Sequence, residues 1–88
     1  MIFISLSRFK KKPTKDMMTQ VLKLHEQMTK EGAKVVSIYW TLGRYDTVAI
    51  IEGKDEKAAM KSLLRYGDVL STETLVAVPA EEARKLVE

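Results

Sequence analysis

The spacing of hydrophobic positions in the first third of the chain predicts a strand followed by a helix. Side chains alternate along residues 2–8, as they do on the two sides of a β-strand. One side would carry Ile2, Ile4 and Leu6, and the other Phe3, Ser5 and Ser7. Pro13 and Thr14 mark the start of a helix, and Gly32 marks its end. Between them, apolar residues recur on one helical face, namely Met17, Val21, Leu24 and Met28.

The middle of the chain predicts a β-hairpin and a second helix. Residues 34–42 and 47–52 are rich in β-branched and aromatic side chains and are joined at Gly43-Arg44. The helix would begin at Lys54 or Asp55 and end at Gly67. Its apolar face would be formed by Ala59, Met60, Leu63 and Leu64.

The last part of the chain completes a recognisable order of elements. Residues 69–78 are predicted as a strand, and Pro79 separates them from one or two helical turns within residues 81–87. The order is therefore β-α-β-β-α-β. Because crossover connections are right-handed, both long helices fall on the same face of one four-stranded antiparallel sheet. The sequence thus predicts an α+β ferredoxin-like fold, with residues 1–88 as a single domain.

Both faces of the predicted hairpin carry bulky apolar side chains. Pairing of Thr41 with Asp46 puts one set of residues on one face, namely Val36, Ile38, Trp40, Thr47, Ala49 and Ile51. The other face receives Val35, Ser37, Tyr39, Thr41, Asp46, Val48 and Ile50. Two helices cover only one face, so the other face is expected to be covered by a second copy of the chain. We therefore expect a homodimer or a higher homo-oligomer whose sheets pack together.

Composition and charge narrow the class of protein. The chain has no cysteine, and its net charge is +3, with a local basic cluster at Arg8 and residues 10–15. No apolar run approaches the roughly 20 residues that span a bilayer. The first apolar residues are followed, and not preceded, by basic ones, which is the reverse of a signal peptide. These features predict a cytoplasmic protein without a membrane partner.

Three stretches of the chain resemble the GYD-domain family, and together they extend over nearly its whole length. These stretches are YWTLGRYD, VAIIEGKDEKAAM and STETLVAV. The characteristic letters of the family fall on Gly43, Tyr45 and Asp46. The resemblance implies the dimeric α+β barrel class, whose members include cofactor-independent monooxygenases, haem-degrading enzymes and ligand-sensing modules. The basic loop at residues 9–15 departs from the more neutral or acidic segment of relatives.

The hairpin tip offers the candidate binding residues. Gly43 suits the positive backbone angle of a tight turn. Asp46 can accept hydrogen bonds from turn amides, pair with Arg44 at the tip, or contact a ligand, and Arg44 and Tyr45 remain for recognition. The predicted ligand-binding residues are therefore Arg44, Tyr45 and Asp46. Tyr39 and Trp40 point to opposite faces and are interpreted as packing residues.

Other chemically active side chains give weaker signals. Glu73, in the last strand, could be a general base if it were buried, or could pair with a neighbouring basic residue. His25 is expected at the flank of the first helix's apolar stripe or on the surface. One histidine without cysteine gives no support for a zinc or haem ligand set. No catalytic residue, metal or cofactor is assigned.

Three functions remain open. The leading hypothesis is a homo-oligomeric binding or regulatory module that holds a small organic ligand between sheet and helices or at the subunit interface. It requires a partly polar cavity near Tyr45, Arg44 and Ser7. The alternative is a cofactor-independent oxygenase or isomerase, with Glu73 or Asp46 as its base beside Arg44. Nucleic-acid binding is disfavoured because the third strand, TVAII, lacks the signature of sheet-surface RNA readers.

Overall fold

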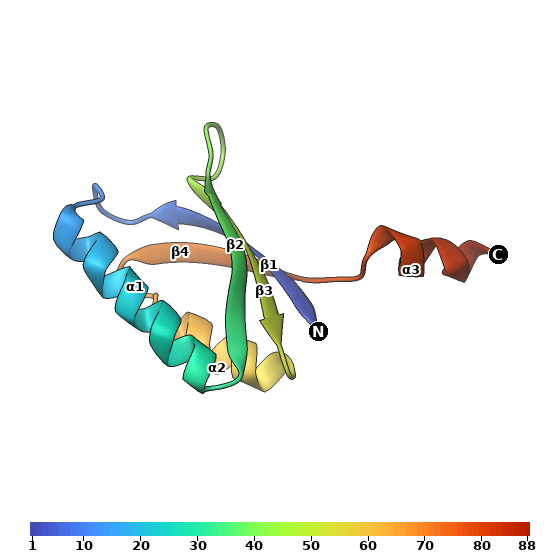
Figure 1. Cartoon of the computed structure of the whole chain (residues 1–88). Coiled ribbons are helices and arrows are strands. Elements are labelled where there is room, and N and C mark those ends of the chain that lie inside the picture. Colours follow the sequence, from blue (N-terminus) through green and yellow to red (C-terminus); the bar gives the residue numbers. More distant parts are fainter.

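A computed structural model describes residues 1–88, and its order of elements is the predicted one (Figure 1). The strands and helices are β1 (Ile2–Phe9), α1 (Lys15–Lys30), β2 (Ala33–Trp40), β3 (Thr47–Gly53), α2 (Glu56–Leu64), β4 (Leu70–Ala77) and α3 (Ala80–Arg84), which continues into a 3₁₀ turn (Lys85–Val87). The sheet has the strand order β2-β3-β1-β4, and every pair is antiparallel. The predicted ferredoxin-like α+β fold is confirmed.

Side-chain caps fix where the two long helices begin. Thr14 accepts a hydrogen bond at Oγ1 from the amide of Met17, over 3.2 Å. Asp55 accepts one at Oδ1 from the amide of Ala58, over 2.8 Å. Each bond satisfies an amide that the first helical turn leaves without a partner. The predicted helix starts are confirmed.

The helices end differently from one another. Gly32 follows α1 with φ +95°, a left-handed conformation that glycine adopts without strain. In contrast, α2 stops at Leu64, three residues before the predicted end at Gly67, whose φ is not positive. The amides of residues 65–67 instead bond to carbonyls three residues back, which makes a tighter turn. This turn carries Tyr66, whose side chain is buried between the helices and the sheet.

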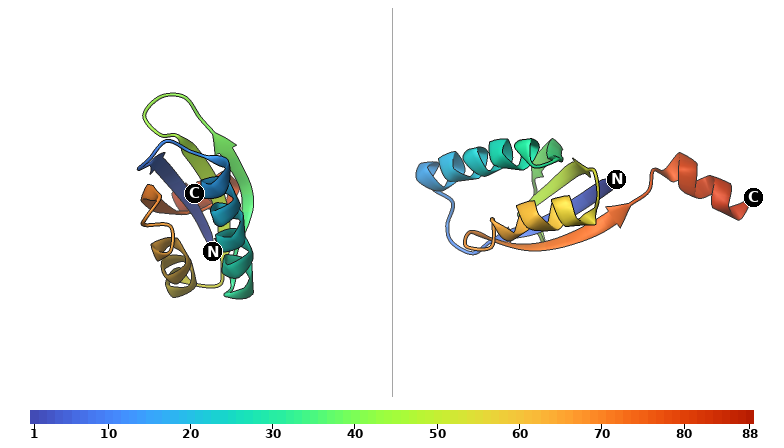
Figure 2. Two further views of the ribbon diagram at one scale, coloured as in Figure 1. Left: turned by 90° about the vertical axis from the view of Figure 1, so that its left-hand side faces the viewer. Right: turned by 90° about the horizontal axis from the view of Figure 1, so that it is seen from below.

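The two long helices lie on one face of the sheet (Figure 2). The main core lies between these helices and one end of the sheet. It is formed by Phe3, Met28, Ala33, Ala49, Ile51 and Ala59. The helix-facing side of β1 is therefore the side with Phe3, Ser5 and Ser7. On α2, Ala58, Ala59 and Ser62 are buried, whereas Met60 and Leu64 are 63% and 74% exposed. The buried face of α2 therefore differs from the predicted one: it is formed by small residues, and two of the large residues predicted for it are exposed.

A β-bulge changes which residues of β2 face the helices. Val35 lies opposite Ile51, but Ser37 lies opposite Ile50, so the register shifts between them. Val36 is the extra residue of this bulge, and Val35 joins Ile38 and Trp40 on the helix-facing side. The prediction that placed Val36 on that face and Val35 on the other is wrong, because a strict alternation cannot anticipate an inserted residue.

The second face of the sheet has no helix over it. It carries Ile2, Ile4, Leu6, Val48, Ile50 and Leu75, all half-buried or exposed. Tyr39, on the same face, is 61% exposed. No helix of the chain is long and apolar enough to cross a membrane. The apolar character predicted for both faces of the sheet is present in the structure.

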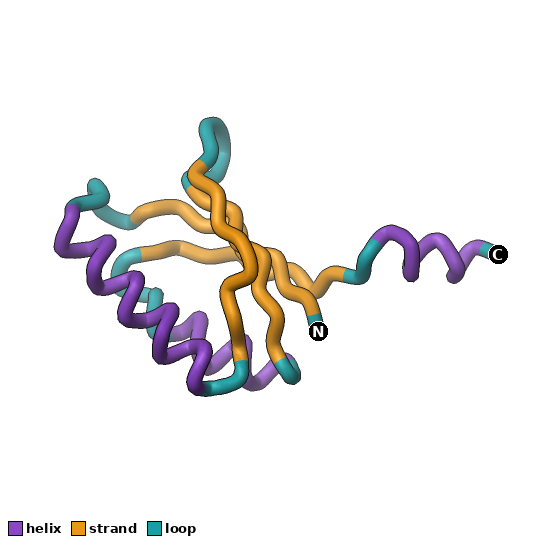
Figure 3. The backbone as a smooth tube through the Cα atoms, in the orientation of Figure 1, coloured by secondary structure: helices purple, strands orange, loops and turns teal.

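The C-terminal segment projects away from the domain. After β4, Pro79 and α3 form an arm that leaves the body of the molecule (Figures 1 and 3). Its residues Leu86 and Val87 are exposed. This arm adds no wall to the space between helices and sheet.

The hairpin tip depends on one glycine. The amide of Thr41 donates to the carbonyl of Asp46 over 2.8 Å, which confirms the predicted pairing. Gly43 has φ +107°, and no atom would lie near an added Cβ. Any penalty of a substitution there is therefore conformational.

We expect Gly43→Ala to destabilise the protein by about 1–2 kcal/mol, the cost of a left-handed conformation for a residue with a Cβ. The free energy of unfolding in urea measures this. Leu42→Ala is the matched control, because the Leu42 side chain is fully exposed beside Gly43. An equal loss in both variants would contradict the argument.

Candidate functional site

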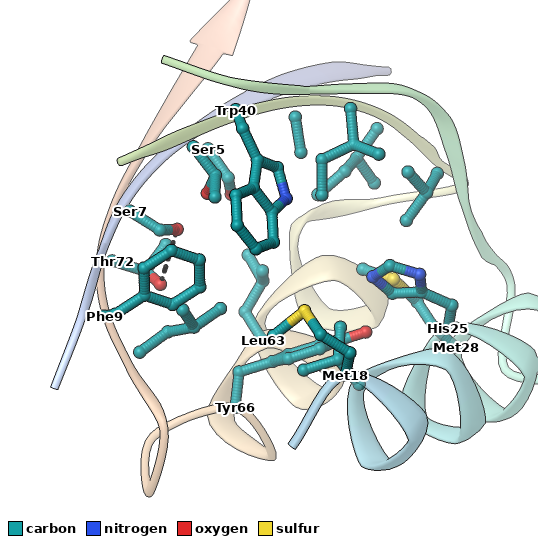
Figure 4. A pocket seen from close by; sticks show the side chains of 17 residues that line it. Ser5, Ser7, Phe9, Met18, His25, Met28, Trp40, Leu63, Tyr66 and Thr72 are labelled. Atoms are coloured by element: carbon teal, nitrogen blue, oxygen red, sulfur yellow. Dashed lines mark hydrogen bonds between the residues drawn. The ribbon is translucent and has the colours of Figure 1, made fainter. Parts of the chain in front are cut away.

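A pocket lies between the helices and the sheet, beside the core (Figure 4). Its cavity is about 60 Å³. The sheet contributes Ser5, Ser7, Phe9, Val35, Ile38, Trp40, Thr47, Ala49, Ile51, Leu70 and Thr72. The helices and the turn after α2 contribute Met18, Val21, His25, Met28, Leu63 and Tyr66. None of these residues is Asp, Glu, Lys or Arg, so the pocket is uncharged unless His25 is protonated.

Hydroxyl groups line the sheet side of the pocket. Ser5 and Ser7 alternate with apolar residues along β1, and both are buried on its helix-facing side. Ser5 Oγ lies 2.9 Å from Thr74 Oγ1, and Ser7 Oγ lies 3.0 Å from Thr72 Oγ1. These cross-strand pairs tie β1 to β4 and satisfy the hydroxyls. Their small side chains leave the space that larger residues would fill.

Tyr66 brings a buried hydroxyl without a hydrogen-bond partner to the helix side of the pocket. Only 4% of the residue is exposed, and its Oη makes no hydrogen bond. The hydroxyl points into the pocket toward His25, and the two ring centroids are 5.8 Å apart (Figure 4). Burial raises the pKa of Tyr66 to about 12. The group is therefore a protonated donor at neutral pH.

His25 lies inside the pocket wall and not on the outer surface. It is half-buried, and its ring faces Tyr66 from α1. Burial lowers the pKa of His25 below its usual 6.5. At neutral pH the imidazole is uncharged, with one donor and one acceptor nitrogen. His25 lies beside the apolar stripe of α1, as expected, and it also forms part of the pocket wall.

Two aromatic rings stand at the edge of the pocket. Phe9 and Trp40 pack edge to face, with ring centroids 5.1 Å apart. Trp40 is 60% exposed, so it is only partly a packing residue. It is also the only tryptophan of the chain, which makes it a reporter of events in the pocket.

The predicted ligand residues at the hairpin tip lie elsewhere. Arg44 and Tyr45 line a separate depression on the helix-free side, of about 250 Å³, with Arg8 and Glu73. Tyr45 Oη donates to Glu73 Oε2 over 2.5 Å, and this bond raises the pKa of Tyr45. The guanidinium of Arg8 lies over the Tyr45 ring, 5.5 Å from its centroid. The ligand role of Arg44 and Tyr45 stays a prediction.

Asp46 holds two strands together. Its Oδ2 accepts from the amide of Phe9 over 2.9 Å, and its own amide donates to the carbonyl of Ser7 over 2.8 Å. These bonds fasten the start of β3 to the end of β1 and so position Phe9 at the edge of the pocket. A structural role accounts for this carboxylate, and its predicted role in ligand binding stays a prediction.

The sequence reasoning placed Ser7 near a cavity, which the structure bears out, but it missed Tyr66 and the hydroxyls of Ser5, Thr72 and Thr74. Ser5, Ser7, Thr72 and Thr74 each alternate with other residues in a strand, and the pairing of β1 with β4 brings them together. That polar alternation on an inner strand was the available signal. Tyr66 gave none, because its position depends on the tight turn after α2. No group of three or more His, Cys, Asp or Glu side chains is arranged to hold a metal ion.

Comparison with known proteins places the chain among small α+β proteins. The family model described as GYD domain matches residues 1–87. The crystal structure of TTHA0845 from Thermus thermophilus is similar, with 26% sequence identity, a TM-score of 0.53, and coverage of 88% of this chain and 91% of that chain. A comparison with curated proteins gave no match. The family match includes every residue that lines the pocket.

We expect Tyr66→Phe to stabilise the ligand-free protein by about 1 kcal/mol, because it removes a buried hydroxyl without a partner and keeps the ring. The raised pKa adds a pH dependence. The contribution of neutral Tyr66 is present below pH 10 and is lost as the pH rises from 10 to about 12. The variant should therefore lose less stability than the wild type over that range.

Urea unfolding at pH 7 and at pH 11 measures both effects. Tyr39→Phe is the control, because it removes the same atom from a residue that is 61% exposed in the single chain and lies outside the pocket. Destabilisation by Tyr66→Phe at pH 7 would mean that the hydroxyl has a structural partner, and would contradict this description of the pocket.

Proposed function

The chain belongs to the GYD-domain family, and we propose that it is a homo-oligomeric module that binds a small organic molecule in the pocket between its helices and its sheet. The observation that carries this proposal is the unpartnered hydroxyl of Tyr66 inside an uncharged, largely apolar pocket. Apolar walls with a few convergent polar groups are typical of small-molecule sites.

The energetic argument is that the ligand-free state is incomplete. A buried donor without an acceptor costs about 1–3 kcal/mol relative to a satisfied one. Cores are normally packed without such groups, and more than nine in ten buried polar groups are paired. A ligand with an acceptor atom would recover this free energy on binding. The pocket therefore favours an occupied state.

The helix-free face supports the oligomeric part of the proposal. Ile4, Leu6 and Ile50 form an apolar surface on the opposite side of the same sheet. Soluble proteins rarely leave such a surface open, and a second copy of the chain would cover it. Because Ser5 and Ser7 alternate with Ile4 and Leu6 on β1, a ligand would contact the strand that also forms the subunit interface. This arrangement suits a regulatory module.

The enzyme alternative lacks its expected base. Glu73 lies on the helix-free side and accepts the Tyr45 hydroxyl, whereas Asp46 bonds to the Phe9 amide. Neither carboxylate lines the pocket. Oxygenase or isomerase chemistry in the pocket would need His25 in place of either carboxylate. The binding module therefore has the stronger support.

Native mass spectrometry of the purified protein tests the ligand part. We expect a retained small-molecule mass, and we expect Ala49→Val to lose it, because the added methyl groups enter the pocket where Ala49 forms the wall. Ala77→Val is the matched control, since Ala77 lies on the helix-free side of β4. Retention of the same mass by Ala49→Val would place the ligand outside this pocket.

The oligomer is tested separately by analytical ultracentrifugation. We expect the wild type to sediment as a dimer or larger species, and Ile50→Lys to dissociate it, because a charge would enter the apolar sheet face. Leu22→Lys, on the exposed side of α1, should leave the mass unchanged. A wild-type monomer would refute the oligomeric part and leave the pocket proposal untouched.

A further inference from the structure

We infer that the ligand of this pocket is an uncharged, mainly apolar compound with a carbonyl oxygen at one end, which accepts a hydrogen bond from Tyr66 Oη. The inference rests on the proposed function and names the chemical class that the same site would take. It is derived from the charge, the donors and the shape of the pocket.

The absence of charge in the walls excludes an ionised ligand group. No Lys or Arg lines the pocket, so a carboxylate or phosphate would lose its hydration without an opposite charge. The ion pairs nearby are already made, since Glu31 binds Lys61 and Arg65 and joins α1 to α2. An uncharged ligand avoids this desolvation cost.

The donor in the pocket calls for an acceptor on the ligand. Within each of the sheet-side pairs, Ser5–Thr74 and Ser7–Thr72, the two hydroxyls already bond to each other, so neither lacks a hydrogen-bond partner. Tyr66 Oη, in contrast, lacks an acceptor, and its phenol is protonated at neutral pH, far below the pKa of about 12 to which burial raises it. A carbonyl oxygen accepts this hydrogen bond and brings no proton that would need an acceptor of its own, such as the second nitrogen of the neutral His25. The ligand group that fits the Tyr66 donor is therefore the carbonyl of a ketone, a quinone or a similar compound.

The size of the space determines where the rest of the ligand lies. The cavity of about 60 Å³ is smaller than the 150 Å³ or so that holds a benzene ring, so it takes only the carbonyl end. The cavity adjoins a groove of about 500 Å³ between α2 and β4, and both are lined by Leu63, Leu70 and Thr72. Met60, Leu64 and Val76 give the groove apolar walls. The apolar body would extend there.

Three probes of nearly equal shape test the class. Benzylacetone ends in an acetyl group, which carries the ketone. Isopentylbenzene has an isopropyl group in its place, and hydrocinnamate has a carboxylate there. Binding is followed at pH 7 in the oligomer as purified, by the NMR signals of the single Trp40 indole and of the Leu63 and Leu70 methyl groups. Each probe is titrated against wild type, Tyr66→Phe and Tyr39→Phe.

We expect benzylacetone to bind the wild type and to bind Tyr66→Phe about tenfold more weakly, the ratio that one buried hydrogen bond supplies. Isopentylbenzene should bind both proteins equally or prefer the variant, and Tyr39→Phe should match the wild type. Hydrocinnamate should not bind. Nuclear Overhauser effects should join the methyl ketone to the Tyr66 ring and the phenyl ring to Leu63 and Leu70.

Other outcomes overturn the inference in distinguishable ways. Binding of hydrocinnamate as tight as that of benzylacetone would refute the uncharged class. An equal effect of Tyr66→Phe on both neutral probes would refute the carbonyl contact, although the pocket would remain a binding site. If no probe perturbs the pocket signals, the ligand class is wrong. The proposed function is then judged by whether the mass retained by wild type is lost in Ala49→Val.

Discussion

The pocket exists because the two central strands, β1 and β3, turn small side chains toward the helices at Ser5, Ser7, Thr47 and Ala49. At one end, Phe3 and Ile51 meet Met28, and the helices pack tightly against them. At the other end, Ser5 and Ser7 present hydroxyls that pair with β4 and reach no further. Two straight helices cannot follow both surfaces at once. The space that results is fixed by close packing elsewhere and does not depend on a flexible loop.

The alternation of side chains along β1 allows one sheet to form both the pocket wall and the helix-free apolar face. Successive residues of β1 point in opposite directions, so Ser5 belongs to the pocket whereas Ile4 and Leu6 belong to the helix-free face. Asp46 fastens the end of β1 to β3 and holds Phe9 at the edge of the pocket. Two of the characteristic family residues therefore have structural roles. Gly43 forms the turn, and Asp46 connects β3 to β1.

Sequence patterns predicted the elements, their order along the chain, both helix starts and the end of α1, because Thr14, Asp55 and Gly32 act through their own local geometry. It failed where several residues decide together. The bulge at Val36 inverted part of β2, and the predicted apolar face of α2 gave way to Ala58 and Ser62, which allow closer approach. Tyr66 enters the pocket through a turn made by backbone hydrogen bonds that no side-chain pattern encodes.

The exposure of β4 has a consequence for how the pocket opens. Residues 71–76 are exposed, and the strand forms its ladder with β1 alone, at an edge of the sheet. Few apolar contacts oppose its detachment, so its amides should exchange with solvent through low-energy local openings. Fraying of β4 would break the Ser5–Thr74 and Ser7–Thr72 pairs at the same time. This wall of the pocket is therefore an edge strand, and its partial unfolding would widen the passage that already leads to the interior from the groove between α2 and β4.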